Sequence, residues 1–534
     1  MDKSVAGSRL LWGSPRKLGP RQNSPPTEAV LPKGVTVIHR KNQNLLTASW
    51  LFVLFVLIYL STAKGVFEYE DDVSMFYVTQ DIVLHGNFST PPKTPGATQG
   101  VDGHWYSKYG IGESILGVPF YFIGNILEKV LPSKEIIDQR GFLRANTLVY
   151  TVCLVGILCT AGVISLVYLV ARELECSPRG AIVTAFCFGL GTFAWHYSRT
   201  FMSEPPSMLT GAISFYGMLR YRNQGRIRWL FLSGSAGGVC LLMRLTNISV
   251  IAPVGAWLLW LLFTKKRDTP LGMLRNVVTW VLPIAVALVM AGIYDLTRFG
   301  NVFETGYGLE AGQFTTPLYV GIYGLVLSPG KSVFLYAPVL LIGLAGWKAL
   351  YHRSTDATIV AAGIAIVYMA FYARYYQWYG GGAWGPRFLT VILPFMAIPI
   401  AAFADKEMNV PKWIIFGGIG LLSLFIQVVS VLVPYVPYEG KMESNPILFA
   451  SLLWNPAASP IIAESASFVA RQYPVDLSFT YYASPALQTF QITSLIAAGF
   501  VFAVGMVVVG RRSQLEQRLV KEIDECAAPD LLPR

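Results

Sequence analysis

The sequence has 534 residues, of which 53% are hydrophobic and only 14% are charged, and its mean hydropathy is +0.48. This composition lies outside the range of soluble globular proteins and indicates a polytopic membrane protein. The six cysteines form no CxxC pair and have no histidine nearby, so a zinc site or a disulfide framework is not expected.

Apolar runs long enough to cross a bilayer predict an all-α polytopic membrane protein with about twelve transmembrane helices. With a cytoplasmic N-terminus, most of the 42 Lys and Arg residues lie on the cytoplasmic side, as the positive-inside rule requires. The net charge of +11 is therefore a topology signal and not a nucleic-acid site, and both termini are expected in the cytoplasm. The predicted helices start near residues 47, 145, 180, 205, 228, 247, 276, 332, 357, 388, 413 and 491.

The pattern of spans and polar segments also predicts the domain organisation. A polar, basic leader is expected to be a disordered cytoplasmic tail. A catalytic transmembrane region follows, with a long first outer loop, and a late outer loop has a role that we expect to be acceptor recognition. The predicted parts are the tail 1–46, the catalytic region 47–433 with its first outer loop 61–144, the late outer loop 434–490, the last transmembrane helix 491–510 and the cytoplasmic tail 511–534.

The first outer loop begins with the stretch FEYEDDVSMFYVTQDIVLHG, residues 67–86. Its periodicity predicts a helix that lies in the membrane interface, with Asp71 as N-cap and Gly86 as C-cap. Capping explains one of the three acids Glu70, Asp71 and Asp72 but not all of them. The alternative is a general base that deprotonates an acceptor, with its neighbour positioning substrate or binding a cation.

A second constellation is WHYSRTFMSEPP, which contains Arg199 and Glu204 at the outer ends of two predicted helices. Glu204 precedes two prolines and would suit a helix start. Together with Arg199 it would equally complete a pocket for an anion and a sugar. Several predicted spans contain no ionisable residue near their middle, which argues against an ion-coupled transporter and places the chemistry at the outer surface.

The third constellation is ARYYQWYGGGAWGPRFLTVILPF, residues 373–395. Its glycines allow backbone to approach a ligand closely, and its tryptophans offer stacking faces. Arg374 and Arg387 offer forked donors for a phosphate. An interfacial aromatic belt would explain the tryptophans, but not the glycines together with two arginines. Further cations at the predicted outer edge, each a snorkelling anchor or a ligand, are Lys108, Arg244 and Lys331.

The arrangement resembles the GT-C superfamily of integral-membrane glycosyltransferases, especially the group of protein O-mannosyltransferases and the lipid A aminoarabinose transferase. In that group the first outer loop opens with an Asp-Glu pair at the start of an interfacial helix. Asp71 occupies the position of the catalytic base here, and Asp72 replaces the Glu. The segments HWYSKYGIGESILGVPFYFIG and GGGAWGPRFLTVILPF are also similar to segments of this superfamily.

The resemblance implies inverting transfer of a hexose or pentose from a polyprenyl-phosphate donor to a lipid, glycan or protein acceptor, on the non-cytoplasmic face of a cell-envelope membrane. It implies Asp71 and Asp72 as catalytic residues. It leaves open a magnesium or manganese ion on Asp71, Asp72 and Glu204. The donor lipid phosphate is assigned to Lys108, Arg244, Lys331, Arg374 and Arg387, and the sugar or acceptor to Tyr106, Arg199, Glu204, Trp378 and Trp384.

Two other functions remain as alternatives at this point. A polysaccharide polymerase or ligase would use the large late outer loop, and its catalysis would not depend on Asp71. A flippase or transporter of a lipid-linked glycan would also need a groove for an amphiphile and outer cations, but midplane ionisable residues and internal repeats are not found in the sequence.

Overall fold

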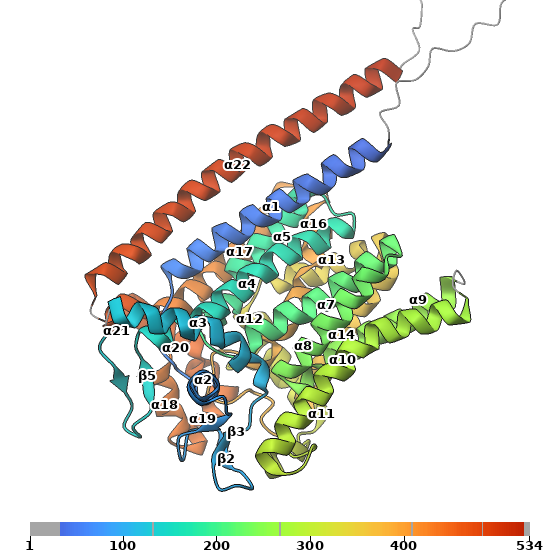
Figure 1. Cartoon of the computed structure of the whole chain (residues 1–534). Helices are drawn as coiled ribbons and strands as arrows, with labels where there is room; N and C mark the ends of the chain where they lie inside the picture. Colours follow the sequence, from blue (N-terminus) through green and yellow to red (C-terminus); the bar gives the residue numbers. More distant parts are fainter. Residues whose placement is uncertain (1–32, 131–132, 266–268, 407–408, 483, 528–534) are drawn as a thin grey trace, which may run out of the picture. The chain divides into compact units, whose positions relative to one another are not determined.

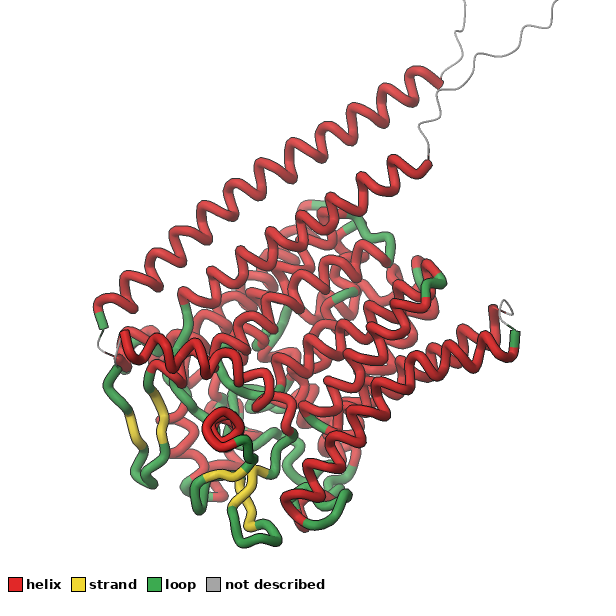
Figure 2. The backbone as a smooth tube through the Cα atoms, viewed as in Figure 1, coloured by secondary structure: helices red, strands yellow, loops and turns green. Residues whose placement is uncertain are grey.

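The computed structural model describes residues 33–130, 133–265, 269–406, 409–482 and 484–527, and most of these residues are helical (Figure 2). Residues 44–534 form one compact unit, and residues 1–43 form a second one. The predicted disordered tail 1–46 lies outside the described residues up to residue 32. Over its remaining residues the structure has a helix, because α1 (Lys33–Ser61) begins at Lys33.

Eight helices of the described chain are long and apolar enough to cross a membrane, which confirms an all-α polytopic membrane protein. Each of the twelve predicted starts falls on or within two residues of a helix. The predicted spans that do not meet the criterion begin near residues 180, 205, 228 and 332, where the helices are short or carry polar residues. The candidate spans lie in α1, α4 (Thr147–Glu173), η1 with α9 (Leu245–Asn247, Ile248–Lys265), α10 (Pro270–Phe299), α14 (Thr355–Arg374), η3 with α15 and α16 (Arg387–Ile392, Leu393–Ala397, Pro399–Ala404), α17 (Val410–Leu432) and α22 (Pro485–Ala527).

Close packing of small residues holds the remaining helices against these spans. A Cβ added to Gly234 of α8 would lie 2.2 Å from the backbone oxygen of Trp280 on α10, so the two helices touch backbone to backbone. Gly217 of α7 approaches α8 in the same way. The other helices of this group are α5 (Pro178–Gly191), α6 (Ala194–Tyr197), α7 (Glu204–Gln224), α8 (Ile227–Met243), α11 (Leu318–Leu327), α12 (Val333–Tyr336) and α13 (Leu340–Arg353) (Figure 1).

The first outer loop folds into α2 (Glu70–His85), α3 (Ile111–Val130) and two small antiparallel sheets. α2 packs on α3, and Gly86 ends α2 with a left-handed φ of 66°, as predicted for a C-cap. The N-terminal prediction is wrong by two residues, because Tyr69 is the N-cap and Asp71 lies inside the first turn. The strands are β1 (Ser89–Thr90), β2 (Ala97–Gln99), β3 (Trp105–Ser107), β4 (Ile136–Ile137) and β5 (Leu143–Ala145), paired in the orders β1-β3-β2 and β4-β5.

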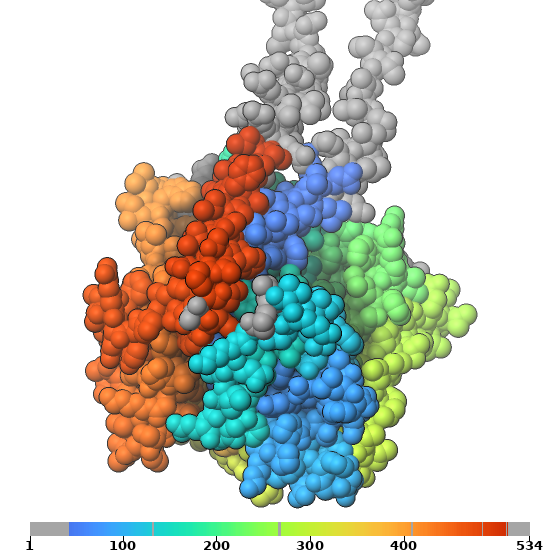
Figure 3. Space-filling view, turned by 60° about the vertical axis from the view of Figure 1, so that its left-hand side comes forward, coloured from blue at the N-terminus to red at the C-terminus, as the bar shows by residue number. Residues whose placement is uncertain are grey.

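The late outer loop packs beside the first one, as Figure 3 shows for the blue and cyan segments next to the orange and red ones. Several contacts join the loops: the amide of Ser478 donates to the oxygen of Ala63 over 3.0 Å, the hydroxyl of Tyr482 donates to the oxygen of Gly65, and Lys64 pairs with Asp476. Its elements are α18 (Val436–Glu443), α19 (Pro446–Trp454), η4 (Pro456–Ala458), α20 (Pro460–Ala470) and α21 (Ser478–Tyr482), and η2 (Gly308–Gly312) lies in the loop after α10.

Candidate active site

Asp71 lies at a crossing of three elements and is almost completely buried. Its Oδ2 is 3.2 Å from Nη1 of Arg387, the first residue of η3, and 3.8 Å from Nη2 of Arg244, which follows α8. Its Oδ1 accepts a 2.8 Å hydrogen bond from the hydroxyl of Tyr109. Burial by itself would raise the pKa of Asp71, but the two guanidinium groups and the hydrogen bond lower it below its ordinary value. Asp71 is therefore an ionised carboxylate at neutral pH.

Glu204 completes a group of two carboxylates and two guanidinium groups. Its Oε1 is 3.1 Å from Nη1 of Arg244 and 3.6 Å from Nε of Arg387. The ring of Phe388 lies under both arginines, with centroid distances of 5.6 and 5.2 Å. Two guanidinium groups thus face two carboxylates. Because each arginine contacts both acids, the four side chains fix one another in position.

A cavity of about 900 Å³ opens next to this group. Its polar wall includes Asp71, Arg244, Arg387 and Lys108. Its lining also includes apolar residues of the candidate spans and of α8, which are Leu241, Met243, Leu245, Ile248, Ala291 and Phe371. The cavity thus combines the ionic group with apolar side chains of the helix bundle.

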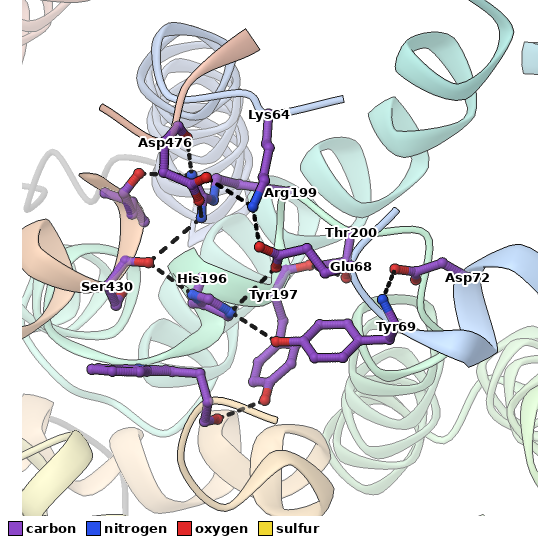
Figure 4. Close-up of polar contacts among 12 residues, drawn as sticks. Lys64, Glu68, Tyr69, Asp72, His196, Tyr197, Arg199, Thr200, Ser430 and Asp476 are labelled. Atoms are coloured by element: carbon purple, nitrogen blue, oxygen red, sulfur yellow. Dashed lines mark hydrogen bonds and ion pairs between the residues drawn. The ribbon is translucent and has the colours of Figure 1, made fainter. Parts of the chain in front are cut away.

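Asp72 points away from this cavity although it is adjacent to Asp71 in the chain. Its Oδ2 accepts a 3.2 Å hydrogen bond from the amide of Tyr69, so Asp72 caps α2 (Figure 4). The side chain is fully buried, and burial raises its pKa well above the ordinary value, with the nearby acids Asp71 and Glu68 adding to the shift. Asp72 therefore serves the helix end and does not face the arginines of the cavity.

The carboxylates do not fit the divalent cation that the sequence left open. Asp71 and Glu204 face guanidinium groups, and Asp72 faces a backbone amide. Within the part of the chain that the structure describes, no group of three or more His, Cys, Asp or Glu side chains is placed to hold a metal ion. No chemical step is therefore derived through a metal, and metal dependence stays a prediction for chelation to test.

The five predicted phosphate ligands are not brought together as a set. Arg244, Arg387 and Lys108 line the cavity, and Lys108 pairs with Glu310 over 2.9 Å. Arg374 is exposed at the end of α14 and donates to the backbone oxygen of Phe314.

Lys331 is buried beneath the glycine turn at residues 380–385 and donates to the backbone oxygens of Gly381 and Ala383. Burial lowers the pKa of Lys331 to about 7, so this amine supports the turn and is a poor ligand for an anion. A Cβ added to Gly382 in this turn would lie 1.8 Å from Oε1 of Glu439, so a larger residue there would displace the carboxylate of Glu439.

Of the predicted sugar or acceptor ligands, only Glu204 touches the group of charges around Asp71. Trp384 is fully buried and stacks on His196, and Trp378 is buried beneath the exposed Trp454. Tyr106 donates to Asp102 in the first outer loop. The sequence cannot tell these three aromatic residues from ligand-binding ones, because the same residue types occur in buried, interfacial and binding positions.

Arg199, the remaining predicted ligand, is 1% exposed and pairs with Asp476 of the late outer loop over 3.1 Å. Arg199 therefore belongs to a second ionic cluster and does not line the cavity.

Sequence reasoning missed several residues that line the cavity. Tyr109 holds Asp71, and Tyr307 and Glu310 close the side at Lys108. Glu439 and Glu443 of α18 face the cavity from the late outer loop. Burial raises the pKa of both acids, and the charge of Glu443 raises the pKa of Glu439 further. The only sequence pattern that links the two acids is their i, i+4 spacing, which puts them on one face of a helix but does not say which part of the protein that face contacts.

One sequence family and several solved structures are similar to this chain. Residues 145–294 match the sequence family described as dolichyl-phosphate-mannose-protein mannosyltransferase, a segment that includes Glu204 and Arg244. No curated protein sequence matches the chain.

Three solved structures are similar at low identity. The S. cerevisiae protein O-mannosyltransferase Pmt1-Pmt2 complex, bound to the sugar donor, is 14% identical with a TM-score of 0.37, and the match covers 52% of this chain and 36% of that one. ArnT from Cupriavidus metallidurans is 12% identical with a TM-score of 0.46, covering 89% and 78%. The oligosaccharyltransferase AglB from Archaeoglobus fulgidus, in complex with an inhibitory peptide and a dolichol-phosphate, is 14% identical with a TM-score of 0.43, covering 73% and 56%.

The class of the protein follows from its bundle of apolar helices: it is an integral, multi-pass membrane protein. Its central segment is similar to a mannosyltransferase family. The resemblance to GT-C glycosyltransferases predicted from the sequence is confirmed, and the part of the chain that matches the mannosyltransferase family is the central segment 145–294.

Proposed function

We propose that the protein transfers a hexose or pentose from a polyprenyl-phosphate donor to an acceptor hydroxyl on the non-cytoplasmic face of the membrane, with inversion at the anomeric carbon. The observation that carries this proposal is Asp71, an ionised and buried carboxylate that contacts Arg387 and Arg244 inside the large cavity. A base and two phosphate-binding cations at one point are what this reaction requires.

The polar and the apolar lining of the cavity suit the two parts of such a donor. The apolar residues Met243, Ile248 and Phe371 suit the first isoprene units of the lipid. The guanidinium groups of Arg387 and Arg244 match the phosphate, since both present forked donors on a planar group. The sugar would then lie beside Asp71 and Tyr109.

The chemistry needs no group beyond these side chains. When the donor phosphate binds the two guanidinium groups, it takes over part of the charge that Asp71 balances without donor. Asp71 then accepts the proton of the acceptor hydroxyl as the acceptor oxygen bonds to the anomeric carbon. The bond between that carbon and the phosphate oxygen breaks, and the electron pair leaves with the polyprenyl phosphate, whose charge Arg387 and Arg244 neutralise.

The late outer loop is proposed to contact the acceptor. Its helix α18 presents Glu439 and Glu443 to the cavity beside the glycine turn. The positive-inside distribution supports a non-cytoplasmic position for this loop and Asp71, with both termini in the cytoplasm. Cysteine labelling from either side of sealed vesicles checks this orientation: a cysteine at Val101 in the first outer loop should react only from the non-cytoplasmic side.

The activity is tested with purified protein in lipid nanodiscs and synthetic polyprenyl-phosphate hexoses and pentoses. Release of free polyprenyl phosphate is measured together with transfer of labelled sugar to lipid, glycan and protein fractions of the host envelope. Sugar transfer that depends on Asp71 supports the proposal and identifies the sugar. Release and transfer that persist in Asp71→Asn protein would reject Asp71 as the base.

A further inference from the structure

A second group of charges is formed by Lys64, Glu68, Arg199 and Asp476 (Figure 4). It is more deeply buried than the first, although Glu68 also lines the cavity. Asp476 accepts from Nζ of Lys64 over 2.8 Å and pairs with Nη2 of Arg199 over 3.1 Å. Lys64 also pairs with Glu68. The four side chains are 1% to 4% exposed. Two cations thus balance two anions out of contact with water, an arrangement in which removal of one partner is far more costly than at a surface.

The remaining polar groups of this cluster add no net charge. His196 lies next to Glu68, with Nε2 4.0 Å from a carboxylate oxygen, but burial lowers its pKa to about 4. Its Nδ1 lies 2.9 Å from the oxygen of Ser430 and must donate to it, so Nε2 accepts from the hydroxyl of Tyr69 over 3.2 Å. Tyr481 donates its hydroxyl to Asp476. The ion pairs of the cluster thus join Lys64, Glu68, Arg199 and Asp476. Glu464 of α20 is a further buried acid near Asp476, and burial raises its pKa to about 7.

The cluster joins the late outer loop to the chain segment that carries Asp71. Asp476 lies between α20 and α21, and its amide donates to the oxygen of Leu432 at the end of α17. Nη1 of Arg199 donates to the backbone oxygens of Val431 and Asp476 over 2.7 and 3.0 Å. Asp476 is thus fixed to the helix bundle on one side, while Lys64 connects it to the segment between α1 and α2 on the other.

That segment, residues 63–69, leads directly into the first turn of α2. Ala63 accepts from the amide of Ser478 and from Nε2 of Gln491, over 3.0 and 2.8 Å. At its other end, Glu68 and Tyr69 line the cavity, two residues before Asp71. Contacts with the late outer loop and with Gln491 of α22 therefore help to hold the segment that leads into α2.

The position of Asp71 depends on this segment because its main partners belong to other elements. Arg387 and Arg244 are held by η3 and by the end of α8, so the 3.2 Å contact between Asp71 and Arg387 requires the start of α2 to stay in place. A displacement of about 1 Å in a reacting group can lower a rate about 100-fold. Asp476 itself does not line the cavity.

We propose that Asp476 is a positioning residue for Asp71: through its ion pairs with Lys64 and Arg199, it fixes the segment that presents Asp71 to the arginines of the cavity. This inference rests on the proposed function of Asp71 as the base. It assigns the late outer loop a role in catalysis in addition to the proposed contact with the acceptor.

The test compares Asp476→Asn with Asp405→Asn, a matched control. Asp405 is also a buried acid that pairs with an arginine, Arg353, but it lies between α16 and α17 and contacts Ser177, far along the chain from α2. Three quantities are measured in nanodiscs: amide hydrogen exchange of residues 63–72, kcat and KM for the synthetic polyprenyl-phosphate sugar, and the pH at which kcat/KM falls to half on the acid side.

Asp476→Asn is expected to speed exchange in residues 63–72 and to lower kcat about 10- to 100-fold, as expected for a misplaced base. The KM for the donor should stay within about threefold, because Arg387 and Arg244 remain. The acid-side midpoint should rise, because Asp71 moves away from the cations that lower its pKa. Asp476→Glu should recover part of kcat, and Asp405→Asn should leave all three quantities unchanged.

The double variant Lys64→Met/Asp476→Asn keeps the charge balanced, with Arg199 and Glu68 remaining, and carries the test if the single variant does not fold. It should regain thermal stability while kcat stays low. Recovery of both, or equal loss of kcat in Asp405→Asn, would show a general structural role and overturn the proposal. Unchanged exchange in residues 63–72 would overturn it as well. Absence of any sugar transfer by the unaltered protein would reject the proposed function, whereas the exchange result would still decide whether Asp476 positions this segment.

Discussion

Replacement of Asp71 by asparagine is the most direct test of the site, because the neighbouring Asp72 supplies an internal control. Asparagine has almost the same shape but cannot accept a proton, so the reaction loses its general base. Such a loss lowers kcat by about 10²- to 10⁴-fold, or about 2.7 to 5.4 kcal/mol of barrier. The protein should still fold, since the hydrogen bond from Tyr109 can be retained by the amide oxygen.

Donor binding should change in the opposite direction. In the unaltered protein, Arg244 and Arg387 are balanced by Asp71 and Glu204. With asparagine at position 71 one positive charge is left over, so a donor phosphate competes with one carboxylate fewer. The KM for the donor should therefore stay equal or fall while kcat falls.

The assay is release of polyprenyl phosphate from a synthetic donor, with Asp72→Asn measured in parallel. Asp72 does not line the cavity, burial raises its pKa, and the amide oxygen of asparagine can still accept from the amide of Tyr69. Asp72→Asn should therefore keep kcat within a few-fold. Activity above about half in Asp71→Asn, or an equal loss in both variants, would refute the assignment of base and cap.

Further predictions concern the cavity wall. Arg387→Gln removes the cation nearest to Asp71, so the acid-side midpoint of kcat/KM should rise and the donor KM should increase, whereas exposed Arg374→Gln should change neither; a pH profile of both variants decides. The sign follows because Asp71 must be ionised to act, and its pKa is lowered mainly by Arg387. Gly382→Ala should impair activity without loss of the transmembrane fold, since its Cβ would meet Glu439; circular dichroism and turnover are measured together. EDTA should leave activity unchanged, and a loss that magnesium or manganese restores would place a metal in the reaction.

The sequence already identified most of the fold because membrane helices are defined by local composition. A span needs about 20 apolar residues wherever it packs, and all twelve predicted starts fall on or beside a helix. The end of α2 at Gly86 was equally local, because a left-handed C-cap favours glycine. The polar leader showed the limit of composition: α1 begins at Lys33, although residues 33–46 have few apolar neighbours in sequence.

The sequence also pointed to short stretches whose residues meet at the cavity, but it did not show which residue of each stretch faces the cavity. Asp71 and Asp72 are the same residue type at adjacent positions. Only the orientation of the first turn of α2 decides that Asp71 contacts Arg387 and that Asp72 caps the helix. Likewise Arg244 reaches the cavity while Arg199 pairs with Asp476.

What the sequence by itself determined is therefore the membrane class, the helices and the concentration of charged residues at their outer ends, since hydropathy and spacing act over a few turns. The tertiary structure decided which charges meet. The contacts between Asp71 and Arg387 and between Arg199 and Asp476 join residues about 300 positions apart. Such pairs depend on how the helices pack and on where the two outer loops touch, and no local pattern records them.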